Sequence, residues 1–315
     1  MISLFKYLSL ASAFSLVGIL TSLAFLLPEV EGYFQESGVK LKRILPPIAA
    51  IWALSSMGVF LSELAVIVDK PLLEIFSGNL IRSFALQVIL GKLLLINILS
   101  ALILLIFVST IKRTGGALAL LIITLLGLLA PYLENHSSSS GHHMLAIGLV
   151  LVHVLALSLW IGGLIALALI TKEERKFAAV RFHSIALWSL FAVALSGLVN
   201  GWVRLGTIAN IISTYGAILV AKTLLLALIF MVAFTFRARQ RKNFDDGVLS
   251  RQLGIEGVLF GITMVFAVVL SRIAPPEVSL TTPINPILGS TMPQSPAFSR
   301  LLLGYEPNEI GRAHV

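Results

Sequence analysis

The chain of 315 residues contains no cysteine. This excludes a disulfide framework, a thiolate metal site and a redox-active thiol. The sequence also lacks three signatures: a GK[ST] phosphate-binding loop, an HExxH helix and the phosphorylatable aspartate motif of an ATP-driven pump. These absences predict that the chain is not an enzyme and that it does not itself use ATP.

Charged residues are scarce as well. They make up 12% of the chain, against about a quarter in a typical soluble domain. Hydrophobic residues make up 57%, and the mean hydropathy is +0.98. Apolar runs of about 20 residues, long enough to cross a bilayer, recur along almost the whole sequence. The composition predicts a polytopic membrane protein whose partner is the lipid bilayer. The net charge of +8 is explained by basic loops rather than by nucleic-acid binding.

We predict an all-α fold, a bundle of about eight transmembrane helices, because backbone polar groups in lipid must be paired within their own segment. The membrane domain is predicted over residues 1–273, with an extracytoplasmic tail over 274–315. The first apolar run exceeds a signal-peptide core and lacks a cleavage pattern, so it is expected to be retained. The predicted spans are residues 3–27, 45–68, 84–110, 115–133, 143–171, 183–205, 212–236 and 252–273.

The distribution of basic residues predicts the orientation. The loops after the odd-numbered spans hold fourteen Lys and Arg residues, and those after the even-numbered spans hold three when Arg204, at the end of the sixth span, is counted with its loop. Basic loops stay in the cytoplasm, so both termini and the loop before residue 143 are predicted to lie outside.

The two halves of the chain also share short matches. "AIWAL" at 50–54 resembles "ALWSL" at 186–190, and "VILGKLLL" resembles "ILVAKTLLL". The matches suggest two tandem four-helix units in parallel orientation, a plan that transporters use. The predicted repeats are residues 1–133 and 143–273.

Four of the six histidines lie between Glu134 and Gly163. His136, His142 and His143, with the adjacent Met144, form a polar patch around the flexible run "SSSSG". Imidazole binds copper, zinc, iron and nickel, and a thioether binds reduced copper. The patch is a candidate metal site, although histidines in loops also occur without any such role.

His153 lies ten residues into a predicted span, roughly 15 Å below the outer surface. An ionisable group at that depth tends to face the bundle interior or a wet cavity. It is about 16 Å along the axis from His142, too far to share one ion. His153 is therefore either a second station on a metal path or a histidine bonded to a neighbouring helix for packing.

Two lysines and two glutamates also lie in or near the predicted spans. Lys92 and Lys222 are placed eight and ten residues below the exterior. A cation would repel a metal ion, so we assign these lysines to structure or gating. Glu256 and Glu63 are candidate partners for them.

Small and polar residues predict close helix contacts elsewhere. Asn200 and Ser196 can hydrogen-bond across helices. "WIGG", Trp160 to Gly163, predicts a notch in which Gly162 and Gly163 let a neighbouring helix approach.

Three segments together resemble the membrane domain of the copper resistance protein D (CopD) family. They are "HHMLAIGLVLVHVLALSLWIGGL", "RFHSIALWSLFAVALSGLVNGWVRLG" and "STYGAILVAKTLLLALI". The earlier part of the chain is similar mainly to a longer bacterial form, in which this domain precedes a cytochrome oxidase assembly (CtaG-like) domain. The resemblance implies copper handling at the bacterial plasma membrane. The positions that match family motifs are His136, His143, His153, Trp160 to Gly163, Tyr215, Gly216 and Lys222.

Our main hypothesis is a protein that binds copper at the outer histidines and moves or delivers it across or into the membrane. Copper ions are its expected cargo, with periplasmic copper chaperones or cytochrome oxidase assembly factors as candidate partners. A haem-binding redox protein is an alternative, but His153 lacks a histidine at its depth, because His183 is placed at the cytoplasmic start of its span. A metal-free scaffold for oxidase assembly is the third possibility.

Overall fold

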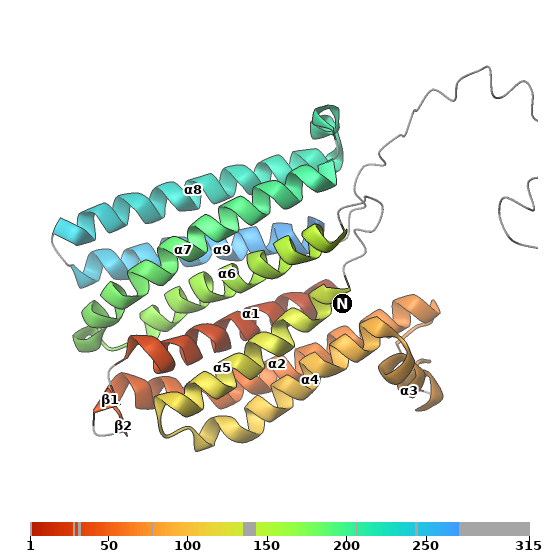
Figure 1. Cartoon of the computed structure of the whole chain (residues 1–315), viewed down its shortest axis with the longest axis horizontal. Coiled ribbons are helices and arrows are strands. Elements are labelled where there is room, and N and C mark those ends of the chain that lie inside the picture. The colour runs from red at the N-terminus through yellow and green to blue at the C-terminus, as the bar shows by residue number, and fades with distance from the viewer. Residues whose placement is uncertain are drawn as a thin grey trace, which may run out of the picture. The chain divides into compact units, whose positions relative to one another are not determined.

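The computed structural model describes residues 2–27, 29–30, 33–72, 74–76, 78–134, 143–205, 207–242 and 245–270 (Figure 1). The predicted tail over 274–315 and the loop histidines His136 and His142 lie outside these ranges. The longer helices are α1 (Ile2–Thr21), α2 (Glu36–Val68), α3 (Gly78–Gln87), α4 (Ile89–Phe107), α5 (Thr114–Leu129), α6 (His143–Leu169), α7 (Lys172–Leu205), α8 (Thr214–Lys242) and α9 (Asp246–Leu270).

Shorter elements extend or join these helices. A π-helical turn, Ser22–Leu26, continues α1, and 3₁₀ turns follow α4 (Val108–Thr110) and α5 (Ala130–Leu133). A further 3₁₀ turn, Ile208–Ile212, precedes α8. The described strands, β1 (Glu29–Val30) and β2 (Tyr33–Phe34), form a two-residue antiparallel hairpin with Glu29 opposite Phe34.

The prediction of an all-α bundle with eight spans is confirmed. Within the described residues, eight helices are long and apolar enough to cross a membrane. Their exposed surface is rich in large apolar side chains, as expected for helices that face lipid. The chain is a multi-pass membrane protein.

Two predicted loops are helical instead. α2 begins at Glu36 rather than at residue 45, and α7 begins at Lys172 rather than at residue 183. The sequence "KEERKFAAVR" is rich in strong helix formers, and Glu173 and Glu174 lie favourably in the first turn of α7. Charge marks where lipid ends, but the helix continues beyond that point.

The predicted third span also differs, because it divides into α3 and α4 at Val88, whose backbone is extended. Phe84 of α3 is buried, and its ring centroid lies 4.9 Å from that of Phe60 of α2. A Cβ on Gly91 would lie 1.9 Å from the Phe84 carbonyl oxygen. The chain therefore needs glycine at this position to fold back tightly.

Helix α1 lies between α2, α5 and α6 and joins the two halves of the bundle (Figure 1). Its closest approach is to α6: a Cβ on Gly162 would lie 2.2 Å from the Phe14 carbonyl oxygen, and one on Gly18 would lie 1.8 Å from the Gly162 carbonyl. Only glycine at both positions permits this separation. Gly163 permits a different contact, with α7, because a Cβ at this position would lie 2.1 Å from the Phe182 ring.

The helices of each half contact one another in the same cyclic order. α1 contacts α2, α2 contacts α4, α4 contacts α5, and α5 returns to α1; α6, α7, α8 and α9 repeat these relations. The matched tryptophans nevertheless differ, since Trp52 is fully buried and Trp188 is 70% exposed. A common repeat remains a prediction.

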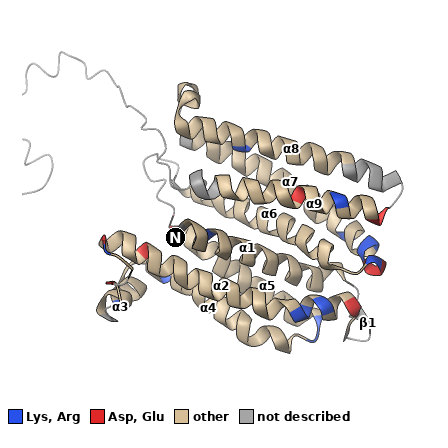
Figure 2. Cartoon of the chain, turned by 180° about the vertical axis from the view of Figure 1, so that it is seen from behind, with Lys and Arg blue, Asp and Glu red and all other residues tan. Residues whose placement is uncertain are grey.

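One end of the bundle, called here the basic end, carries the starts of α2, α7 and α9. Figure 2 shows that Lys and Arg gather there. Arg175 of α7, which is 9% exposed, binds Asp246 of α9 at 2.9 Å and donates to the Ile170 carbonyl at 2.8 Å. Ser37 of α2 and Thr171 share a hydrogen bond of 2.9 Å between their hydroxyls. These contacts fix the α6–α7 connection against α2 and α9.

Replacing Gly162 with alanine should destabilise the bundle by about 1–3 kcal/mol or more, because the new methyl group would force α1 and α6 apart. Thermal unfolding in detergent, followed by size-exclusion chromatography, measures the effect. Gly148→Ala on the same helix is the matched control, since nothing lies within 4 Å of a Cβ there. Equal stability of the two variants would contradict the proposed close contact.

Candidate functional site

The candidate site centres on His153, a half-buried residue of α6 that faces α7. Its Nδ1 lies 3.0 Å from the Ser196 hydroxyl oxygen. The same hydroxyl donates to the Ala192 carbonyl and has a longer contact of 3.3 Å with the Val193 carbonyl. The histidine thus makes the contact with a neighbouring helix that the packing alternative predicts.

This network favours one tautomer of the ring. A serine hydroxyl has a single hydrogen, and that of Ser196 is directed to the carbonyls of its own helix. Ser196 Oγ must then accept, so Nδ1 of His153 carries the proton and donates. Nε2 is left with its lone pair, the form in which a neutral imidazole binds a metal.

Gly197 provides the room for this ring. A Cβ at that position would lie 3.2 Å from Cε1 of His153 and 3.5 Å from Nδ1. These separations are tight, so any larger residue would move the imidazole. The sequence signal was the run of small and polar residues "SGLVNG", which marked a helix contact but not which side chain it receives.

Lys222 of α8 lies at the same level of the bundle as His153. A Cβ on Gly201 of α7 would lie 3.1 Å from Leu219 of α8. Gly197 lies one turn from Gly201 on α7, and Lys222 lies one turn from Leu219 on α8. Because the two helices run antiparallel, both residues lie on the same side of this contact. The lysine is half-buried. A protonated lysine at this level would oppose long residence of a metal ion there.

Lys92 is shallower than predicted. Because α4 begins at Ile89, Lys92 lies in its first turn, and its side chain is exposed. Glu63, a candidate partner for the lysines, instead binds Lys6 of α1 at 2.6 Å. Lys92 therefore does not lie along the predicted metal path from the outer histidines to His153.

Other predicted residues surround the site or the start of α8. Asn200 lies one turn from Ser196 on α7, and its Oδ1 is buried without a hydrogen-bond partner among the described residues. Tyr215 is 3% exposed. The Gly216 N–H donates to the Ser213 hydroxyl at 3.0 Å, and a Cβ on Gly216 would lie 2.4 Å from the Asn210 carbonyl. Gly216 thus lets the chain turn into α8.

The outer histidine patch lies mostly outside the described residues. His136 and His142 are not described, and His143 is described only as the first residue of α6. Met144 is 81% exposed. Within the described ranges, no group of three or more His, Cys, Asp or Glu residues could hold a metal ion. His153 therefore belongs to no such group among the described residues.

Trp160 and Glu256 lie deeper in the same half of the bundle. Trp160 is fully buried and meets the Phe260 ring edge-on, with 4.6 Å between centroids. Glu256 is fully buried on α9, and its Oε1 accepts a hydrogen bond of 2.6 Å from Nε2 of Gln252. The aromatic pair lies between the levels of His153 and Glu256.

His183 was predicted at the start of its span, but α7 begins eleven residues earlier. It still does not share the level of His153, because thirteen residues of α7, roughly 20 Å, separate it from Ser196. Within the described residues, no second histidine lies opposite His153 as an axial haem ligand.

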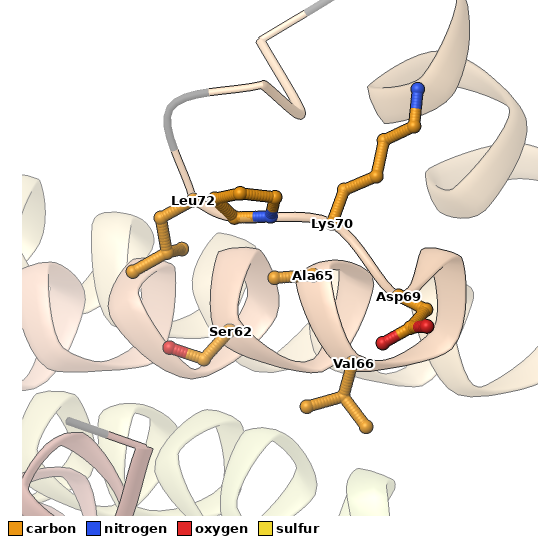
Figure 3. Close-up of a pocket in the computed structure, with 7 residues that line it drawn as sticks. Ser62, Ala65, Val66, Asp69, Lys70 and Leu72 are labelled. Carbon is orange, nitrogen blue, oxygen red and sulfur yellow. The ribbon is translucent and has the colours of Figure 1, made fainter.

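A separate hollow lies where α2 ends (Figure 3). Asp69 ends the helix in the left-handed conformation, with φ 52°, and Lys70 follows. The hollow contains none of the predicted metal residues. Its lining consists of Ser62, Ala65, Val66, Asp69, Lys70, Pro71 and Leu72.

Comparison with known families adds one match. The profile of copper resistance protein D matches residues 176–270, which span most of α7, all of α8 and α9. The match to the CopD family therefore rests on these residues, about the last third of the described chain. No curated protein and no solved structure matches the chain. The CopD segment includes Ser196, Gly197 and Lys222, whereas His153 lies on the preceding helix and packs onto that segment.

Proposed function

We propose that this protein binds copper and moves or delivers it across or into the membrane. The observation that supports the proposal most directly is the His153–Ser196 contact, which leaves Nε2 of a half-buried imidazole available to a metal. The match to a copper resistance family indicates which metal, because imidazole alone would also bind zinc, iron or nickel.

The proposed path has two stations. His136, His142 and His143, with Met144, capture copper from the aqueous side. His153, ten residues further along α6, roughly 15 Å deeper, receives the ion inside the bundle. Lys222 then limits how long the ion remains, because two like charges repel.

The cellular setting is part of the proposal. The basic end faces the cytoplasm of a bacterium, and both termini lie outside the plasma membrane. Periplasmic copper chaperones or oxidase assembly factors would then meet the histidine loop. The protein acts as a carrier or binding protein and not as an enzyme.

Replacing His153 with alanine should remove the deeper copper site, and Ser196→Ala should weaken it about 10–100-fold, the usual loss when a ligating histidine loses its orienting partner. Copper titration of purified protein against a competing chelator, in both oxidation states, measures these changes. His183→Gln is the control, because His183 lies far from the site and should leave binding unchanged. Equal affinity of all four proteins would refute a site at His153.

Replacing His136, His142 and His143 together with alanine should abolish capture at the outer patch, because the loop loses its imidazole ligands. Cells that produce this variant should accumulate less copper than cells with the wild-type protein, measured by elemental analysis. His314→Ala, near the end of the chain, is the matched control. Unchanged copper content in the triple variant would argue for a metal-free scaffold.

The absence of native cysteine makes the orientation directly testable. Thr207→Cys, at the end opposite the basic end, should react with a membrane-impermeant maleimide in intact cells. Lys112→Cys, between α4 and α5 at the basic end, should react only after permeabilisation. Both positions are exposed, so the reversed labelling pattern would show the opposite topology.

A further inference from the structure

The outer surface of α7 near the basic end carries a charged side chain that the copper proposal leaves without a role. Arg181 is exposed, yet two groups hold its guanidinium in place. Nη1 donates to the Phe25 carbonyl at 3.3 Å, and the guanidinium carbon lies 4.2 Å from the centroid of the Phe177 ring. Phe25 belongs to the π-helical turn that continues α1. The cation is therefore oriented by α1 and α7 together.

This arrangement leaves most of the guanidinium available to a ligand. An arginine has five N–H donors, and the structure gives Arg181 this one hydrogen bond among the described residues. Because the residue is exposed, its remaining donors are accessible from outside the bundle. A planar fork of donors matches the oxygen atoms of a phosphate group, to which arginine can donate two parallel hydrogen bonds.

Arg181 lies at the level where the phosphate groups of a bilayer occur. From Leu205, where α7 ends, 24 residues, roughly 36 Å, lead back to Arg181. The hydrocarbon layer is about 30 Å thick, so the guanidinium lies just beyond it when Leu205 is at the opposite boundary. Trp188 and Phe191, on the same side of α7, are 70% and 59% exposed. They extend an apolar surface over roughly 15 Å, the depth of one leaflet.

The charge around Arg181 favours an anion. Residues 172–181 at the start of α7 include four basic residues and two acidic ones, Glu173 and Glu174. Glu174, the nearer of these two, is seven residues from Arg181, roughly 10 Å towards the basic end. α5 contacts the same π-helical turn, and residues 112–113, both basic and exposed, precede that helix. Figure 2 shows how Lys and Arg gather at this end of the bundle.

We infer that Arg181 is the centre of a binding site for an anionic phospholipid in the leaflet at the basic end. The phosphate group binds the oriented guanidinium. An acyl chain lies along the exposed apolar side chains of α7, which a free phosphate ion cannot use. The site lies on the outside of the bundle, away from the copper path, and it does not depend on copper being the cargo.

Lipid titration of the purified full-length chain, followed by native mass spectrometry without any metal, tests this inference. Phosphatidylglycerol should bind more tightly than phosphatidylcholine with the same acyl chains. Arg181→Gln should weaken phosphatidylglycerol binding about fivefold or more, the factor that corresponds to one basic residue at an anionic membrane surface. Arg181→Lys restores the charge without the planar fork, so it should recover part of the lost affinity.

Arg251→Gln is the matched control, because it removes the same charge from an exposed position near the start of α9. It should leave the affinity unchanged, and size-exclusion chromatography confirms that each variant is folded. Equal affinity of the wild type for the two lipids would overturn the inference, as would equal effects of the two glutamine substitutions. Displacement of the lipid by inorganic phosphate would show a site for a free anion instead. Because no metal is used, this test can fail while the copper proposal stands, and the reverse also holds.

Discussion

The architecture depends on the close contact between α1 and α6. Gly18 and Gly162 let the two backbones meet without intervening side chains, and α1 thereby joins the first four spans to the last four. Lipid offers no hydrophobic driving force between helices, so close backbone packing has to supply much of the attraction. Without this contact, the half of the bundle that carries His153 and Glu256 would lose the helix that supports it.

Polar groups inside the bundle occur at separate levels, each with its own partners. His153, Ser196 and Lys222 occupy one level, and Glu256 and Gln252 another, with Trp160 and Phe260 between them. At the basic end, Arg175 joins α7 to α9.

Sequence patterns predicted the number of spans well and the depth of individual residues poorly. The apolar runs are long and almost uncharged, so the eight spans could be counted directly. Lys92 was placed too deep because the predicted span ran through the break at Val88, after which α4 starts. The start of α7 was missed because the predicted boundary followed charge, whereas the helix starts well before its apolar part. Glu63 was assigned to the wrong lysine, because its partner Lys6 comes from a helix whose position the sequence does not give.

The sequence by itself determined the membrane class, the absence of thiol chemistry and the residue types from which a metal path could be built. These properties follow from composition and from the length of apolar runs, which are local. Only the tertiary structure decided that His153 meets Ser196 and Gly197 and that Glu256 is fully enclosed. Such facts depend on which faces of distant helices pack together, and uniformly apolar helices carry almost no periodic signal of which face turns inward.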